Sequence, residues 1–264
     1  MKNKAKIWIA IAITAIIFFL SVILINNTDC NVIKTNANAV SNKKIGWGIK
    51  RSNTHEQPDV GSYNRQVLEE NGGICLGSNE NKYIYLTFDE GYEAGYTESI
   101  LNTLKDNDVK AIFFLTAHYV NTNPDLVKRM IDEGHIIGNH TVNHKSMPDL
   151  SDEEINKEVM ELHQVLYDKF GYEMKFLRPP MGEFSERTLK YTSSLGYKTV
   201  MWSFAYQDWN ENKQPDESSS KEKIIKNFHN GEIMLLHGNS KTNTNILDAI
   251  IKEAKNEGYE FKLL

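Results

Sequence analysis

Two histidines four residues apart, His140 and His144, are the first side chains in this sequence whose type and spacing suggest chemistry. A neutral imidazole nitrogen is a common ligand of divalent metal ions, and one turn of backbone can present both rings to a single ion. The pair therefore predicts two metal ligands. The alternative is that hydrogen bonds at a strand end satisfy each ring, because histidines recur at this spacing by chance.

Two successive carboxylates, Asp89 and Glu90, precede Gly91 where an apolar run ends. Neighbouring residues of a strand point to opposite faces. At a strand end, one carboxylate can therefore reach a metal ion while the other reaches the water bound to it. The alternative is a solvated acidic turn.

A rigid turn is predicted at Arg178-Pro179-Pro180-Met181-Gly182. The two prolines remove two backbone donors, which leaves the N–H groups from Met181 onward free to face a substrate oxygen. Arg178 is a permanent cation that can orient a carboxylate and lower its pKa. A stiff loop with a surface charge is the alternative.

A histidine, His237, ends the apolar run 233–236, and an acid beside an aromatic, Asp208-Trp209, lies upstream. A histidine in that place can act as a general acid. Asp208 is suited to tuning His237, and Trp209 to stacking on a sugar face. Alternatively, His237 is a partly buried ring bonded to backbone, and Trp209 belongs to the core.

Strand-like and helix-like segments alternate over most of the chain, which predicts a parallel sheet. The polar residues above each follow an apolar run, as active-site residues do in a (β/α) barrel. We therefore predict a distorted α/β barrel of about seven parallel strands. A doubly wound open sheet is the alternative, although neither standard Gly-rich phosphate loop is present. The strands are predicted at 83–88, 111–115, 135–138, 175–177, 199–202, 233–236 and 259–263, and the helices at 96–106, 124–133, 152–170, 185–195, 221–229 and 243–257.

The N-terminal segment 1–26 is predicted to be a membrane anchor. Residues 7–25 are uncharged and almost wholly apolar, and three lysines precede them. This length spans a bilayer as a helix, and the lysines place the N-terminus in the cytoplasm. We therefore predict a single-pass membrane protein with an extracytoplasmic domain; a cleaved signal peptide is the alternative.

The rest of the chain divides into three predicted parts. Residues 27–45 have linker composition, residues 46–80 form an ordered lead-in, and residues 81–264 form the catalytic domain. The net charge is −5 and the pI is near 5.9, with no basic stripe, which argues against a nucleic-acid partner. Cys30 and Cys75 are either plain thiols or a disulfide, since sequence cannot show their geometry.

Taken together and in this order, the motifs resemble those of the polysaccharide deacetylase (NodB-homology, carbohydrate esterase family 4) domain over about residues 80–264. Within that family the sequence is similar to the sporulation-associated muramic-δ-lactam deacetylases. That likeness rests on Thr-Phe-Asp-Glu-Gly-Tyr-Glu at 87–93, Gly-His-Ile-Ile-Gly-Asn-His at 134–140, Arg-Pro-Pro at 178–180, Phe-Ser-Glu-Arg-Thr at 184–188 and Gly-Trp-Gly at 46–48.

The resemblance implies a role for each matching residue. Asp89 is the general base, Arg178 orients it and His237 is the general acid, tuned by Asp208. Two departures from the family pattern bear on the site. Glu90 stands where many members have an aspartate as third metal ligand, and Ala205 replaces one carboxylate of an Asp-x-x-Asp-Trp pattern. The resemblance also implies that the metal ligands are His140, His144 and Glu90. It implies that the backbone N–H of Met181 helps to form the oxyanion hole. The substrate contacts it implies are made by Met181, Gly182, Trp209 and Tyr92.

The predicted function is metal-dependent de-N-acetylation of peptide-free N-acetylmuramic acid in peptidoglycan, a step in muramic-δ-lactam formation of spore cortex. The predicted cofactor is one divalent ion, zinc before cobalt or manganese. The predicted partners are the glycan strand and an upstream N-acetylmuramoyl-L-alanine amidase. Alternatives are an N-acetylglucosamine deacetylase acting on peptidoglycan or chitin-like oligomers, an inactive glycan-binding module, and a glycosidase. The last would need Asp89 and Glu90 about 5 Å or more apart across a scissile bond.

Overall fold

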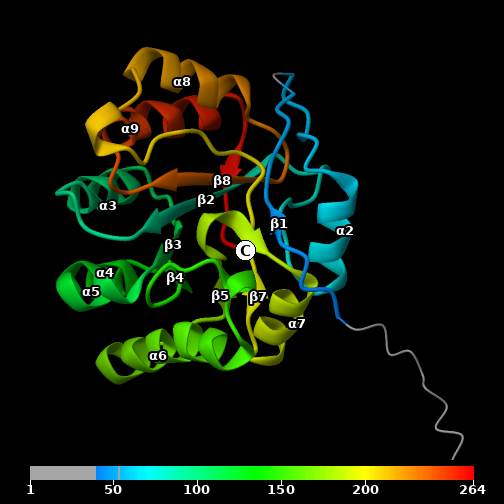
Figure 1. Cartoon of the computed structure of the whole chain (residues 1–264). Coiled ribbons are helices and arrows are strands. Elements are labelled where there is room, and N and C mark those ends of the chain that lie inside the picture. The colour runs from blue at the N-terminus through cyan, green and yellow to red at the C-terminus, as the bar shows by residue number, and fades with distance from the viewer. Residues whose placement is uncertain (1–39, 53) are drawn as a thin grey trace, which may run out of the picture. The chain divides into compact units, whose positions relative to one another are not determined.

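The computed structural model describes residues 40–52 and 54–264, and Val40–Leu264 form one compact unit (Figure 1). The predicted membrane anchor and most of the predicted linker lie outside the described residues, as does Cys30. Within the described ranges, no helix is both long and apolar enough to cross a membrane. Cys75 is buried as a free thiol.

Seven parallel strands form the central sheet, in the order β7-β5-β4-β3-β2-β8, with β9 also pairing with β2. Each lies within or overlaps one of the seven predicted strand runs. The two ends of the sheet approach each other through one isolated parallel bridge, Phe204 to Met234. The fold is therefore an α/β half-barrel of parallel strands, and among the described residues this bridge alone joins the two edges of the sheet. The strands are β2 Tyr83–Glu90, β3 Ile112–Leu115, β4 Ile136–Asn139, β5 Phe176–Leu177, β7 Lys198–Thr199, β8 Glu232–His237 and β9 Glu260–Phe261.

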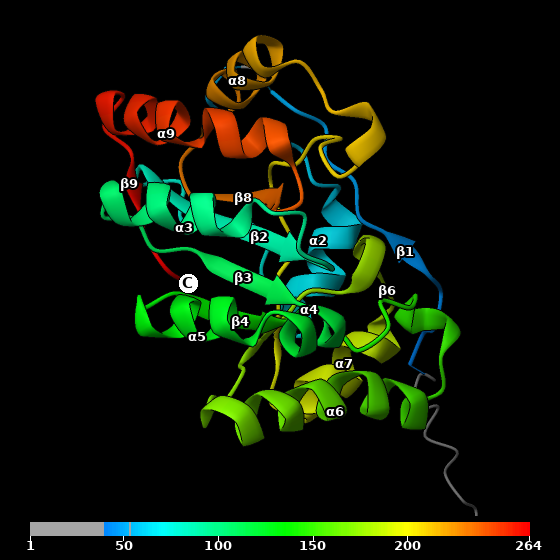
Figure 2. The same ribbon diagram turned by 90° about the vertical axis from the view of Figure 1, so that its left-hand side faces the viewer.

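Helices cover the outer face of the sheet, where α9, α3, α5 and α6 follow one another side by side (Figure 2). The sequence explains several helix ends. A capping box between Ser151 and Glu154 begins α6, and Gly171 ends it in the left-handed conformation that glycine favours. The helices are α2 Ser62–Glu70, α3 Thr97–Asp106, α4 Ala117–Thr122, α5 Pro124–Asp132, α6 Asp152–Phe170, α7 Glu186–Ser194, α8 Glu217–Lys226 and α9 Lys241–Asn256.

The segment before β2 packs against the C-terminal half of the domain. Its short strand β1 (Ile45–Gly46) pairs antiparallel with β6 (Glu183–Phe184). Trp47, Leu68 and Cys75 are buried in a second apolar cluster, separate from the main core between sheet and helices. The described residues also include three single turns of 3-10 helix, at Met147–Asp149, Pro180–Gly182 and Glu211–Lys213.

Candidate active site

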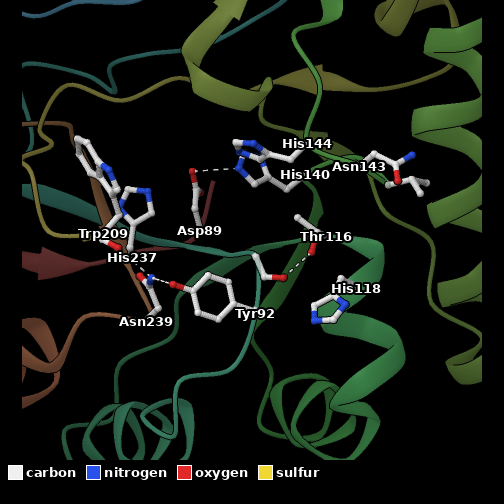
Figure 3. A pocket seen from close by; sticks show the side chains of 12 residues that line it. Asp89, Tyr92, Thr116, His118, His140, Asn143, His144, Trp209, His237 and Asn239 are labelled. Atoms are coloured by element: carbon white, nitrogen blue, oxygen red, sulfur yellow. Dashed lines mark hydrogen bonds and ion pairs between the residues drawn. The ribbon is translucent and has the colours of Figure 1, made fainter. Parts of the chain in front are cut away.

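A cleft lies at the carboxyl ends of the strands, and the predicted chemical residues converge on it (Figure 3). Asp89 is the last residue but one of β2, His237 is the last residue of β8, and the two are paired residues of adjacent parallel strands. Figure 3 shows His140 and His144 on one side of Asp89, and His237 with Trp209 on the other. The cleft has a lobe of about 720 Å³ and a smaller, more apolar lobe of about 380 Å³, and both lobes are lined by Asp89, His140, His144, Trp209 and His237.

Asp89 is held by Arg178, as the sequence predicts. Arg178 is fully buried, and its Nη1 donates hydrogen bonds to Asp89 Oδ1 at 2.7 Å and to Thr87 Oγ1 at 2.9 Å. Its guanidinium also lies 4.2 Å from the centroid of the Phe114 ring. Burial raises the pKa of the Asp89 carboxyl, but Arg178 and, to a smaller extent, His140 and His237 outweigh it, so the pKa is lowered. Asp89 is thus an ionised base at neutral pH.

The histidine pair lies on a loop with unusual backbone geometry. His140 and His144 have ring centroids 4.8 Å apart, and both Thr141 and His144 have positive φ angles, of 68° and 55°. Glu158 of α6 fixes the loop, because its carboxylate accepts hydrogen bonds from the backbone and side-chain N–H groups of Asn143. Hydrogen bonds that Asn143 donates to the buried Glu158 carboxylate therefore offset the strain of the left-handed residues.

The ring nitrogens of His140 have separate surroundings. Nδ1 lies 2.9 Å from the backbone carbonyl of Arg178, which fits a protonated Nδ1 donating to that oxygen. Nε2 then keeps its lone pair, 3.6 Å from Asp89 Oδ2. Burial lowers the pKa of His140 to about 4, and it also lowers that of His144. Both rings are neutral near pH 7, which is the form that binds metals.

Glu90 does not join this group. It is buried, and its Oε1 lies 3.4 Å from Thr97 Oγ1, while Oε2 has no hydrogen-bond partner among the described residues. A Cβ added to Gly238 would lie 1.7 Å from Glu90 Oε1. Glu90 therefore points under Gly238 and towards α3, away from the cleft. The prediction of Glu90 as a third metal ligand does not agree with this placement, because adjacent residues of β2 face opposite sides.

The donors that remain fit a divalent ion in type but not as a complete set. Two neutral imidazoles and the nearby Asp89 carboxylate are suitable donors for zinc and its neighbours. Across residues 40–52 and 54–264, however, no three His, Cys, Asp or Glu side chains are arranged as a metal site. His140 and His144 therefore remain the two predicted metal ligands in this part of the chain.

His237 is backed by a buried carboxylate on its far side. Its Nδ1 lies 2.7 Å from Asp208 Oδ1, and Asp208 Oδ2 accepts hydrogen bonds from the His237 backbone N–H and from Asn243 Nδ2. Burial lowers the pKa of His237, but Asp208 outweighs it and the pKa is raised. His237 can therefore carry a proton at neutral pH and deliver it from Nε2.

The Pro-Pro turn borders the smaller lobe. Met181 has a φ of 58° and is 55% exposed. The N–H of Gly182 is not free as predicted, because it donates to the Pro179 carbonyl at 3.2 Å. Gly182 instead serves close packing, since a Cβ there would lie 2.7 Å from the Trp202 ring. Of the backbone N–H groups predicted to face a substrate oxygen at Met181 and Gly182, that of Gly182 is therefore excluded and that of Met181 remains.

The rim of the larger lobe combines predicted and unpredicted residues. Asn239 Nδ2 donates to Tyr92 Oη at 2.8 Å and to the Trp209 carbonyl at 3.0 Å, which joins three loops. His118 of α4 and Asn143 line the opposite side. Asn143 lies between His140 and His144, in the stretch where the sequence predicts metal ligands, but the pattern assigns no role to it. His118 lies outside every predicted motif, because α4 is too short for a periodic signal.

The site at the carboxyl ends of the half-barrel is typical of a hydrolase. It combines an ionised carboxylate (Asp89), two neutral imidazoles (His140 and His144) and an imidazole paired with a carboxylate (His237). Residues 77–200 match the family model described as polysaccharide deacetylase. The structure is similar to that of Bacillus subtilis PdaA, described as a family 4 carbohydrate esterase, with a TM-score of 0.82 and 43% identity, over 85% of this chain and 96% of that one.

Sequence comparison agrees with the structural likeness. The chain is 44% identical over 227 residues to the peptidoglycan-N-acetylmuramic acid deacetylase PdaA of B. subtilis, covering 86% of each. It is 36% identical over 201 residues to a peptidoglycan-N-acetylglucosamine deacetylase of Bacillus cereus, covering 75% of this chain and 93% of that one. The protein belongs to the polysaccharide deacetylases, the family 4 carbohydrate esterases, and is a hydrolase.

Proposed function

We propose that this protein removes the N-acetyl group from peptide-free N-acetylmuramic acid of peptidoglycan, a step towards the muramic-δ-lactam of spore cortex. The observation that carries the proposal is the placement of Asp89 and His237. They are paired in register across β2 and β8, and each has a buried partner of opposite charge. The likeness to B. subtilis PdaA supports N-acetylmuramic acid as the sugar.

The proposed reaction is hydrolysis of the acetamide bond. Asp89 takes a proton from the attacking water, and His237 gives a proton to the departing amine, which yields the free amino sugar and acetate. Met181 offers its N–H to the developing oxyanion. When held by His140 and His144, a divalent ion, for which we propose zinc before cobalt or manganese, supplies polarisation of the acetyl carbonyl.

The setting of the reaction follows from the sequence and is part of the proposal. An N-terminal anchor would hold the domain on the outer side of the membrane, beside peptidoglycan. An N-acetylmuramoyl-L-alanine amidase would act first, because the lactyl carboxyl must be free before the new amine can close onto it.

The test uses the full-length protein in detergent and peptidoglycan strands with and without prior amidase treatment. Chelator or zinc is added, and the products are read by mass spectrometry. We expect zinc-dependent loss of acetyl only from amidase-treated strands. Asp89→Asn and His237→Ala should lower the rate by about 100-fold or more, whereas Asp168→Asn on the exposed face of α6 should not. Acetyl loss from untreated strands or chitin oligomers would instead assign N-acetylglucosamine, and no acetyl loss with any metal would refute deacetylation.

A further inference from the structure

A second groove, of about 670 Å³, opens beside the active-site cleft, with which it shares Tyr206 and Trp209. Among the residues that the structure describes, three cationic ones line it, Arg51, Lys213 and Lys223, and no aspartate or glutamate does. We call it the basic groove. In a protein of net charge −5, such a concentration of positive charge produces a local field that favours anions.

Two of the three cations, Arg51 and Lys223, contact aromatic rings or backbone. Arg51 donates a hydrogen bond to the Ala205 carbonyl, and its guanidinium lies 5.7 Å from the centroid of the Phe204 ring. Lys223 Nζ lies 5.6 Å from the centroid of the Tyr206 ring. These contacts hold Arg51 and Lys223 in place but neutralise neither charge.

No carboxylate among the described residues forms an ion pair with Arg51, Lys213 or Lys223. By contrast, Lys226, which lies on helix α8 together with Lys223, forms an ion pair with Glu222. The charges of the basic groove are therefore available to a ligand.

Trp209 connects the groove to the site of chemistry. Its side chain lines both cleft lobes and the groove, and it is 49% exposed. An exposed indole face suits stacking on a sugar ring. A glycan strand with one sugar at Asp89 can therefore continue over Trp209 into the groove.

We propose that the basic groove binds the free lactyl carboxylate of a neighbouring muramic sugar on the same strand; this rests on the function proposed above. In peptide-bearing strands this carboxyl is consumed in an amide bond to the stem peptide and carries no charge. The groove would thus distinguish peptide-free from peptide-bearing strands at a distance from the acetyl group.

The test measures binding by calorimetry with full-length protein carrying Asp89→Asn, so that turnover does not intervene. The probes are a muramic-containing tetrasaccharide with free lactyl carboxylates and the same tetrasaccharide with lactyl carboxamides. Lys213→Gln with Lys223→Gln should weaken binding of the carboxylate probe by about threefold to tenfold, and binding of the carboxamide probe should not change. Added salt should reduce the difference. The matched control, Lys157→Gln with Lys169→Gln on α6, removes the same charge elsewhere and should change neither affinity.

Equal weakening for both probes would overturn the proposal, because the groove would then contact sugar without reading charge. Undiminished affinity for the carboxylate probe would overturn it as well. Acetate release by the unmodified protein is measured separately. If no acetate is released but the charge-selective loss of binding is found, the proposed reaction fails while the basic groove stands as a carboxylate site.

Discussion

Asp89 and His237 each depend on a buried partner of opposite charge. Burial alone would raise the pKa of Asp89 and lower that of His237, which would leave a neutral acid and a neutral imidazole. Arg178 reverses the first shift and Asp208 the second. The two partners thus set an ionised base and a protonated acid over the same pH range, as amide hydrolysis requires.

A first prediction concerns Asp208→Asn. The substitution removes the negative charge that raises the pKa of His237, so that pKa should fall. Because protonated His237 is the active form, the alkaline limb of the pH profile of kcat/KM should move to lower pH. Profiles from about pH 5 to 10 test this, with Asp168→Asn as the exposed control. An alkaline limb that stays in place would show that His237 is not the titrating acid.

A second prediction concerns Glu90→Gln. Because Glu90 faces α3 rather than the histidines, zinc affinity should change by less than about threefold, whereas His144→Ala should weaken it by about tenfold or more. Calorimetric zinc titration separates the two. A large loss of affinity in Glu90→Gln would mean that the Glu90 side chain turns to the metal when the metal binds.

Among the elements, the long and strongly patterned ones could be predicted from the sequence. The apolar runs of β2 and β8 and the capped helix α6 are examples. The pairing of β2 with β8 could not be predicted, because the two strands lie near opposite ends of the domain's sequence and no local pattern links them. Nor could α4, which has six residues, or the strands β1 and β6, which have two each.

In the active site, residue types were more predictable than directions. Asp89, Arg178, Asp208 and His237 meet as their chemistry indicates. The direction of Glu90 depends on whether the strand continues or bends at its last residue, which sequence alone does not set. His118 reaches the cleft only because α4 begins directly after β3.

A third prediction concerns the contact between β2 and β8. Gly238→Ala should destabilise the protein by about 1–3 kcal/mol, because its new methyl group would overlap the buried Glu90 carboxyl. The cost should fall when Glu90→Ala is present, since the space is then open. Urea unfolding of the two single variants and the double variant measures this coupling. Gly91→Ala, where nothing lies within 4 Å of the added Cβ, is the control. Additive costs would contradict the contact.

On the scale of the whole molecule, the segment before β2 supports the wall of the cleft. Trp47 donates from its indole nitrogen to the Trp202 carbonyl at 2.9 Å, and its backbone N–H donates to the Gly182 carbonyl at 2.9 Å. Both acceptors lie beside the Met181 turn. The lead-in thus helps to position the predicted oxyanion donor.

A fourth prediction follows for Trp47→Ala. Loss of this buried side chain should lower the free energy of unfolding by about 3–5 kcal/mol. It should also lower kcat by a larger factor than it raises KM, because the Met181 turn loses its support. Chemical denaturation and steady-state kinetics measure both. Tyr63→Ala, at a position 58% exposed, should cost less than about 0.5 kcal/mol. If folded Trp47→Ala protein keeps its kcat, the lead-in does not position the Met181 turn for catalysis.

The pairing of β2 with β8 also has a consequence for when activity begins. Asp89 is synthesised early in the domain and His237 close to its end, and pairing of distant segments is slow relative to local folding. A chain that ends before β8 therefore lacks His237, the proton donor of the proposed reaction, although it already contains the histidine loop and α6. On the proposed mechanism, deacetylation can therefore begin only after β8 has been synthesised and has paired with β2.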